Sequence, residues 1–94
     1  MITVRNMLSS SGNEVANQFE IFTEDARIFQ SYKSTIAKVM KKSNKTYLDK
    51  NYWDYSVTTG RYRNEFLGES KRETEKKIKS GEYILTDLNQ KEVT

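Results

Sequence analysis

The segment from Tyr47 to Arg63 combines aromatic rings and cations at a density that indicates a binding surface. Single-stranded nucleic acids bind such mixtures because cations contact phosphates while flat rings stack on bases, at about 1–3 kcal/mol per base. A lysine cluster lies directly before this segment. The candidate nucleic-acid or partner-binding residues are therefore Lys38, Lys41, Lys42, Lys45, Tyr47, Lys50, Tyr52, Tyr55, Arg61 and Arg63.

A competing interpretation places many of these rings in the core. Only 35% of the residues are hydrophobic, so aromatic side chains must supply much of the buried volume. We favour core positions for Trp53, Tyr62 and Phe66. The lysines from Lys38 to Lys45 are either phosphate contacts or a solvated hairpin tip, and the solvated interpretation is favoured because edge and turn lysines block strand aggregation.

Catalytic chemistry finds little support in the residue types. Cysteine and histidine are both absent, which excludes thiolate metal sites and imidazole acid–base chemistry. Asp49 and Asp54 are the acids of the aromatic segment, and we expect them to act as caps or in Asx turns. No glycine-rich phosphate-binding motif occurs. The sequence predicts a protein that is not an enzyme and that holds no metal or cofactor.

Charge is concentrated in the middle of the chain. The net charge is +3 over 94 residues, yet residues 33–63 contain eight basic and two acidic side chains. The longest apolar runs, such as 83–85, are far shorter than the roughly 20 residues of a membrane span. No export signal follows Met1. We expect a cytoplasmic protein that has no membrane contact and whose basic middle third faces its partner.

Period-two alternation predicts a sheet in the first half of the chain. Strands are expected over 17–23 and 27–32, with a hairpin turn between them. The run 35–39 is also β-prone, but Ile36 falls on the face of Tyr32 whereas Ala37 and Val39 fall on the face of Phe29. A bulge or bend near 31–34 would reconcile the two halves. A short strand at 46–48 follows a polar turn.

Capping signals predict two helices in the second half. Ser56 caps a helix over 57–67, and the capping box that begins at Ser70 starts another over 71–80. A last strand follows at 83–86. The predicted fold is α+β, with an antiparallel three- to four-stranded sheet followed by two short helices and a closing strand.

The predicted domain organisation has three parts. Residues 1–16 are expected to form a flexible N-terminal arm whose few apolar side chains dock on the sheet. Residues 17–88 form the single α+β domain, since 94 residues leave no room for a second core. Residues 89–94 are expected to be a frayed tail.

Several motifs make the sequence familiar. Asn17-Gln18-Phe19, Phe29-Gln30-Ser31-Tyr32, Trp53-Asp54-Tyr55-Ser56 and Phe66-Leu67-Gly68 resemble a family of small uncharacterised proteins encoded by phages and mobile elements of bacteria. The resemblance covers about residues 13–89. It implies an accessory protein of the bacterial host cytoplasm, and such proteins are often inhibitors of host machinery, including anti-CRISPR proteins.

Three functions therefore remain open from the sequence. The first is a non-enzymatic accessory protein that binds a host protein or ribonucleoprotein complex and modulates it. The second is a module that binds single-stranded DNA or RNA through its basic aromatic segment. The third is a self-associating assembly component. The sequence leaves the oligomeric state open.

Overall fold

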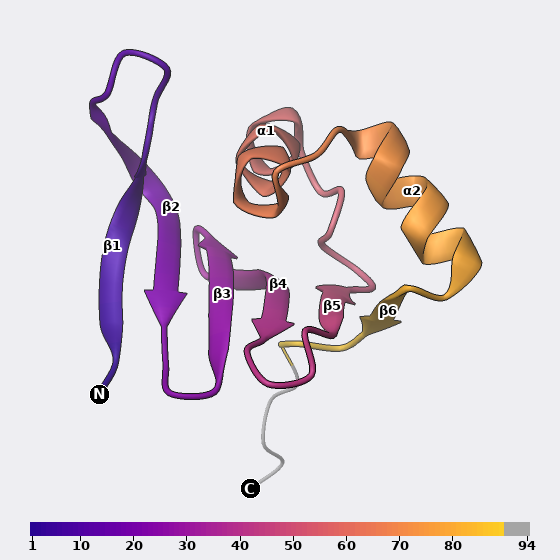
Figure 1. Cartoon of the computed structure of the whole chain (residues 1–94). Coiled ribbons are helices and arrows are strands. Elements are labelled where there is room, and N and C mark those ends of the chain that lie inside the picture. Colours follow the sequence, from indigo (N-terminus) through magenta and orange to yellow (C-terminus); the bar gives the residue numbers. More distant parts are fainter. Residues whose placement is uncertain (90–94) are drawn as a thin grey trace, which may run out of the picture.

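The computed structural model describes residues 1–89, which form a six-stranded sheet and two helices (Figure 1). The elements in chain order are β1 (Thr3–Leu8), β2 (Glu14–Phe22), β3 (Ala26–Ser31), β4 (Ser34–Met40), β5 (Thr46–Asp49), α1 (Val57–Leu67), α2 (Lys71–Ser80) and β6 (Tyr83–Thr86). The strands lie in the sheet in sequence order. All pairs are antiparallel except β5 with β6, which are parallel because both helices intervene. The predicted α+β class is confirmed, and the closing strand joins the sheet.

The segment expected to be an N-terminal arm forms β1 and the first part of β2. β1 pairs with β2 from Thr3 to Leu8, and Met7 is buried in the core. The polar run between them is a hairpin turn, in which the amide of Gly12 donates to the carbonyl of Ser9 at 2.9 Å. Residues 1–16 are therefore part of the sheet and not a flexible arm. Their regular structure comes from pairing with β2, which their own composition does not indicate.

A β-bulge in β4 explains the ambiguous alternation of the third strand. Phe29 pairs with Ala37, but Gln30 pairs with Thr35, so Ile36 is an extra residue. The bulge turns both Ile36 and Ala37 toward the same side, and both are fully buried. A bulge is thus present as expected, but it lies within β4 rather than near 31–34.

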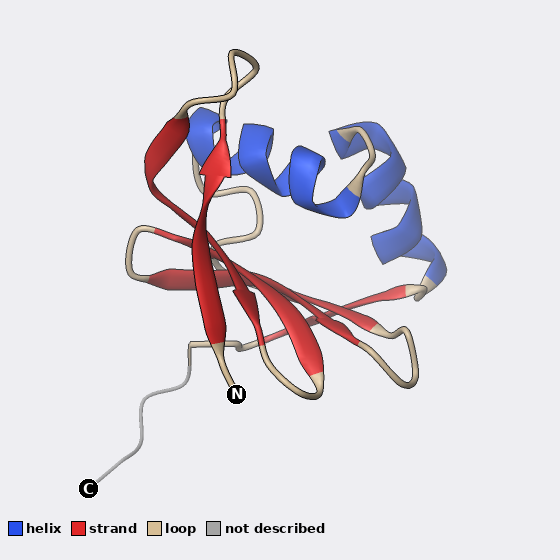
Figure 2. Cartoon of the chain, turned by 60° about the vertical axis from the view of Figure 1, so that its left-hand side comes forward, coloured by secondary structure: helices blue, strands red, loops and turns tan. Residues whose placement is uncertain are grey.

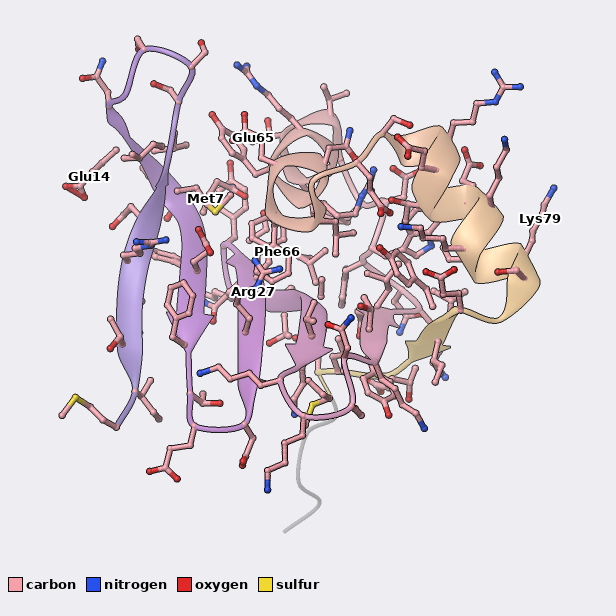
Figure 3. The ribbon with its side chains drawn as sticks, viewed as in Figure 1. Met7, Glu14, Arg27, Glu65, Phe66 and Lys79 are labelled. Carbon is pink, nitrogen blue, oxygen red and sulfur yellow. The ribbon has the colours of Figure 1, made fainter. Side chains whose placement is uncertain are left out.

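Both helices cover one face of the twisted sheet, and the core lies between the two layers (Figure 2). Tyr62 and Phe66 of α1 reach down to the sheet, where the Phe66 ring lies 5.8 Å from that of Phe29. The guanidinium of Arg27 also lies over the Phe66 ring, 4.3 Å from its centre (Figure 3). The predicted burial of Tyr62 and Phe66 is confirmed, whereas Trp53 is half-buried against the core.

Local capping fixes the ends of both helices, as predicted. The Ser56 hydroxyl accepts from the amide of Thr59 at 3.1 Å, and the capping box of α2 is complete. Gly68 ends α1 with φ 70° and Gly81 ends α2 with φ 84°, values that glycine adopts without strain.

The chain after β6 is tied to β4. The side-chain amide of Asn89 accepts from the amide of Thr35 at 2.7 Å and donates to its carbonyl at 2.8 Å. It thereby continues the hydrogen-bonding ladder beyond the end of the short β5. The rest of the expected tail, 90–94, lies outside the described residues.

Candidate functional site

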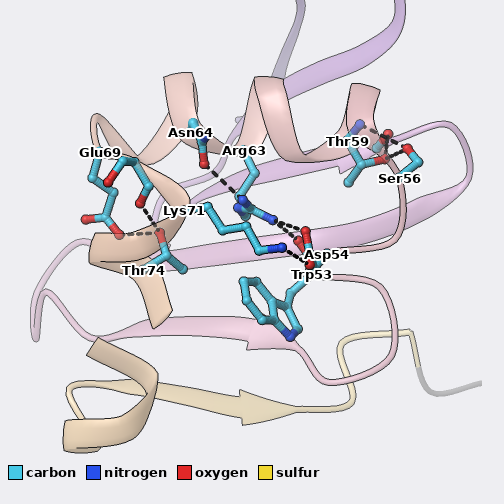
Figure 4. A network of polar contacts seen from close by, with 11 residues as sticks. Trp53, Asp54, Ser56, Thr59, Arg63, Asn64, Glu69, Lys71 and Thr74 are labelled. Carbon is cyan, nitrogen blue, oxygen red and sulfur yellow. Dashed lines mark hydrogen bonds and ion pairs between the residues drawn. The ribbon is translucent and has the colours of Figure 1, made fainter. Parts of the chain in front are cut away.

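Arg63 lies beneath the surface and clamps the aromatic segment to α1 (Figure 4). Its side chain is only 1% exposed. The guanidinium donates to the carbonyl of Trp53 at 2.5 Å, to Asn64 Oδ1 at 2.9 Å and to Asp54 Oδ1 at 3.3 Å. It also lies 5.1 Å from the centre of the Trp53 ring. Although the sequence suggests a partner-binding cation here, this guanidinium is occupied inside the fold.

Asp54 and Asp49 are both engaged in holding the chain. Burial opposes ionisation of Asp54, but hydrogen bonds from Lys71 and Arg63 outweigh it and lower the pKa of the carboxyl. The Asp49 carboxylate is fully buried and accepts hydrogen bonds from the backbone amides of Asn51, Tyr52 and Leu88 at 2.8–3.0 Å. Asp49 therefore makes the Asx turn that the sequence predicts, whereas Asp54 pairs with Lys71 and Arg63 instead of acting as a cap.

Six residues form a continuous row across the face of the sheet that the helices do not cover, which we call the helix-free face. The pairing partners in register are Val4, Ile21, Ile28, Lys38, Tyr47 and Ile84, one from each strand. Their neighbours Phe29, Ala37 and Leu48 point into the core, so strand alternation directs the row to the opposite side. We call these six residues the cross-strand row.

The cross-strand row is apolar at five of its six positions. Val4 and Ile84 at its two ends are 57% and 39% exposed, and the four central side chains are half-buried. Lys38 is the single charged member, and it lies opposite Ile28 on one side and Tyr47 on the other. Two of the predicted site residues, Lys38 and Tyr47, are thus direct neighbours on this face.

The remaining predicted lysines lie in loops. Lys41, Lys42 and Lys45 are exposed in the turn between β4 and β5, and Lys50 is exposed just after β5. Lys41 donates through Nζ to the carbonyl of Thr23 at 2.6 Å, so it also joins this turn to the β2–β3 turn. This position at a hairpin tip agrees with the solvated interpretation.

Tyr52 and Tyr55 line a groove of about 740 Å³ beside the β3–β4 turn. They share it with Tyr32, a residue that the sequence interpretation missed as a site candidate. We call this pocket the tyrosine groove; its lining residues include Tyr32, Lys33, Ser34, Tyr52, Tyr55 and Ser56. Arg61 lies on the exposed side of α1, in a neighbouring groove that also reaches Ser56. Ser56 therefore borders both the groove of Tyr52 and Tyr55 and the groove of Arg61, whose guanidinium lies 5.6 Å from the centre of the Tyr62 ring.

Among residues 1–89, the acidic side chains form no group of three or more that could hold a metal ion. Within the same part of the chain, neither helix has the length and apolar character needed to cross a membrane.

Comparison with known proteins gives one result. The model of a family of unknown function (DUF8033) matches residues 2–82, which is most of the chain. The chain matches none of the curated proteins and none of the solved structures. The motifs that suggested an uncharacterised family all lie inside the matched range. The chain belongs to the DUF8033 family.

Proposed function

We propose that this domain is a non-enzymatic binding protein that docks on a protein partner through the helix-free face of its sheet. The cross-strand row carries the proposal. An antiparallel sheet with helices on one face normally turns polar side chains to water on the other. Here the cross-strand row presents apolar side chains at five positions, exposed at its two ends and half-buried between them, and apolar surface of this kind is typical of interaction sites.

The charge of Lys38 indicates the chemistry of the partner surface. Lys38 lies between Ile28 and Tyr47 in the row. Asp49 points to the same side of β5, but three backbone amides occupy its buried carboxylate. A partner with an apolar patch and a carboxylate opposite Lys38 therefore complements this face. A second copy of the chain presents another lysine and offers no such carboxylate in its row.

The biological context is part of the proposal. The resemblance to phage and mobile-element proteins supports a partner from the bacterial host, in the cytoplasm, where the domain acts as a modulator of host machinery. Anti-CRISPR activity is one form that such modulation takes. The basic net charge supports contact with an acidic protein surface rather than nucleic-acid mimicry, because a mimic presents carboxylates where phosphates lie.

Site-specific photo-crosslinking in bacterial cells tests the docking face. A benzophenone amino acid replaces Val4 or Ile84, at opposite ends of the cross-strand row, or Val57 on α1 as the control. Val57 is 92% exposed, so the control position is at least as accessible as the other two. We expect one protein to be captured from both row positions and not from Val57. Capture of the same proteins from all three positions, or capture of the chain by itself, contradicts the proposal.

A further inference from the structure

The backbone of Tyr32 has a conformation that bulky residues rarely adopt. Tyr32 and Lys33 form the two-residue turn between β3 and β4, since Ser31 pairs with Ser34. The φ angle of Tyr32 is 55°, in the left-handed region that favours glycine or asparagine. Its amide donates to the carbonyl of Asn17 at 2.6 Å, which holds the turn in place.

This strained position contributes little to the core. The Tyr32 side chain is 52% exposed, so its ring is not retained for burial. Glycine would fit the turn with less strain. Strained residues of this kind gather where a ligand is bound, and Tyr32 faces the tyrosine groove. The ring itself is therefore the feature that needs an explanation.

The tyrosine groove offers flat rings next to cations. Tyr55 is 65% exposed, and its ring packs edge-on against Tyr52 with 5.6 Å between centres. Lys33 lines the groove, and no described residue lining it is acidic. Rings that are exposed beside hydroxyls and an ammonium group suit a ligand with flat bases and negative charge.

The neighbouring groove extends this chemistry. It holds about 730 Å³, adjoins the tyrosine groove at Ser56, and is lined by Arg61 and Lys71 among others. Its acidic residue, Asp54, is already paired with Lys71 at 2.7 Å and with Arg63 at 3.3 Å. Arg61 therefore adds an exposed cation to the groove that adjoins the rings.

We propose that the tyrosine groove binds single-stranded nucleic acid. The rings of Tyr32 and Tyr55 stack on unstacked bases, while Lys33 and Arg61 contact the flanking phosphates. This inference is independent of the docking face, because its residues lie outside the cross-strand row. It places nucleic-acid binding at the tyrosines rather than at the lysine cluster of the β4–β5 turn.

Fluorescence anisotropy with labelled oligo-dT and oligo-U of ~12 nucleotides tests this site. We expect micromolar binding of at least one oligomer at low salt. Two phosphate contacts predict that affinity falls about sevenfold when salt rises from roughly 50 to 200 mM. We expect Tyr32→Gly and Tyr55→Ser each to weaken binding about tenfold, and Tyr32→Phe to retain it. Lys33→Gln should flatten the salt dependence.

Two controls separate this site from other surfaces. Tyr47→Ser removes a ring from the helix-free face, and the triple alanine variant of Lys41, Lys42 and Lys45 removes the turn lysines. Circular dichroism verifies that each variant is folded. No binding at low salt overturns the inference. Binding that survives both Tyr32→Gly and Tyr55→Ser, or that depends on Tyr47 or the turn lysines instead, also overturns it.

Discussion

Replacing Arg63 with methionine tests whether its buried guanidinium is a structural clamp. Methionine retains much of the apolar volume but removes the hydrogen bonds to Trp53, Asn64 and Asp54. Each hydrogen bond to a charged group contributes about 1.5–3 kcal/mol. Part of the loss is offset, because Asp54 keeps Lys71 and because a buried charge no longer has to be desolvated. We expect the free energy of unfolding to fall by about 2–4 kcal/mol.

Urea denaturation followed by tryptophan fluorescence measures this loss. The single tryptophan, Trp53, lies against the guanidinium, so the probe reports on the affected region. With a slope of about 1.5 kcal/mol per molar urea, the midpoint should shift by about 1–3 M. Arg61→Met is the matched control, since Arg61 is exposed two residues away, and we expect a change within about 0.5 kcal/mol. Equal stability of the Arg63 and Arg61 variants refutes the clamp.

Three other variants test further parts of the fold. Glu69 is 4% exposed and accepts hydrogen bonds from Thr74, Lys77 and Tyr83, so Glu69→Gln should lower the unfolding free energy by about 1.5–3 kcal/mol, against little change in Glu75→Gln. Burial opposes ionisation of Glu69, but these hydrogen bonds outweigh it and lower the pKa of the carboxyl below 4.5. The stability of the wild type should therefore fall as pH drops below about 4.5. Stability should fall less steeply in Glu69→Gln, which lacks this carboxyl group. If the stability of the wild type and of Glu69→Gln falls equally steeply below about pH 4.5, the role given to Glu69 is contradicted. Tyr32→Gly should raise the melting temperature by relieving about 1 kcal/mol of strain, and an unchanged or lower value argues against strain. Ser70→Ala should cost about 1 kcal/mol through loss of the capping box, and equal melting curves count against it.

Local signals explain why the helices and most strands could be predicted from the sequence. Ser56, Ser70 and the two C-terminal glycines act within one helical turn, so their effect does not depend on the rest of the fold. β2 shows period-two alternation, but its apolar residue Ile21 lies on the helix-free face, whereas Phe29 of β3 and Leu48 of β5 face the core.

Long-range pairing explains what the sequence did not reveal. β1 is an edge strand in which only Met7 is buried, so its own pattern is weak and its order comes from β2. The parity problem at Ile36 showed that a bulge was needed, but the register with β3 decides where it lies.

In the candidate site, too, local features could be predicted from the sequence and long-range contacts could not. The aromatic content of 52–55 drew attention to Tyr52 and Tyr55, and the structure places both along one groove. Arg63 looked like an exposed cation in a basic run, because its acceptor on Trp53 comes near only when the segment folds back. Tyr32 gave no sequence signal as a site residue, since its left-handed backbone arises from the two-residue turn.

The affinity of the captured partner for variants of the helix-free face tests the central claim most directly. Isothermal titration calorimetry compares the wild-type domain with Lys38→Glu in the cross-strand row and with Val57→Glu on α1. Reversing the charge opposite a partner carboxylate should weaken binding at least about tenfold, whereas the change at Val57 should have no effect. Equal affinities for all three proteins would contradict docking through the helix-free face.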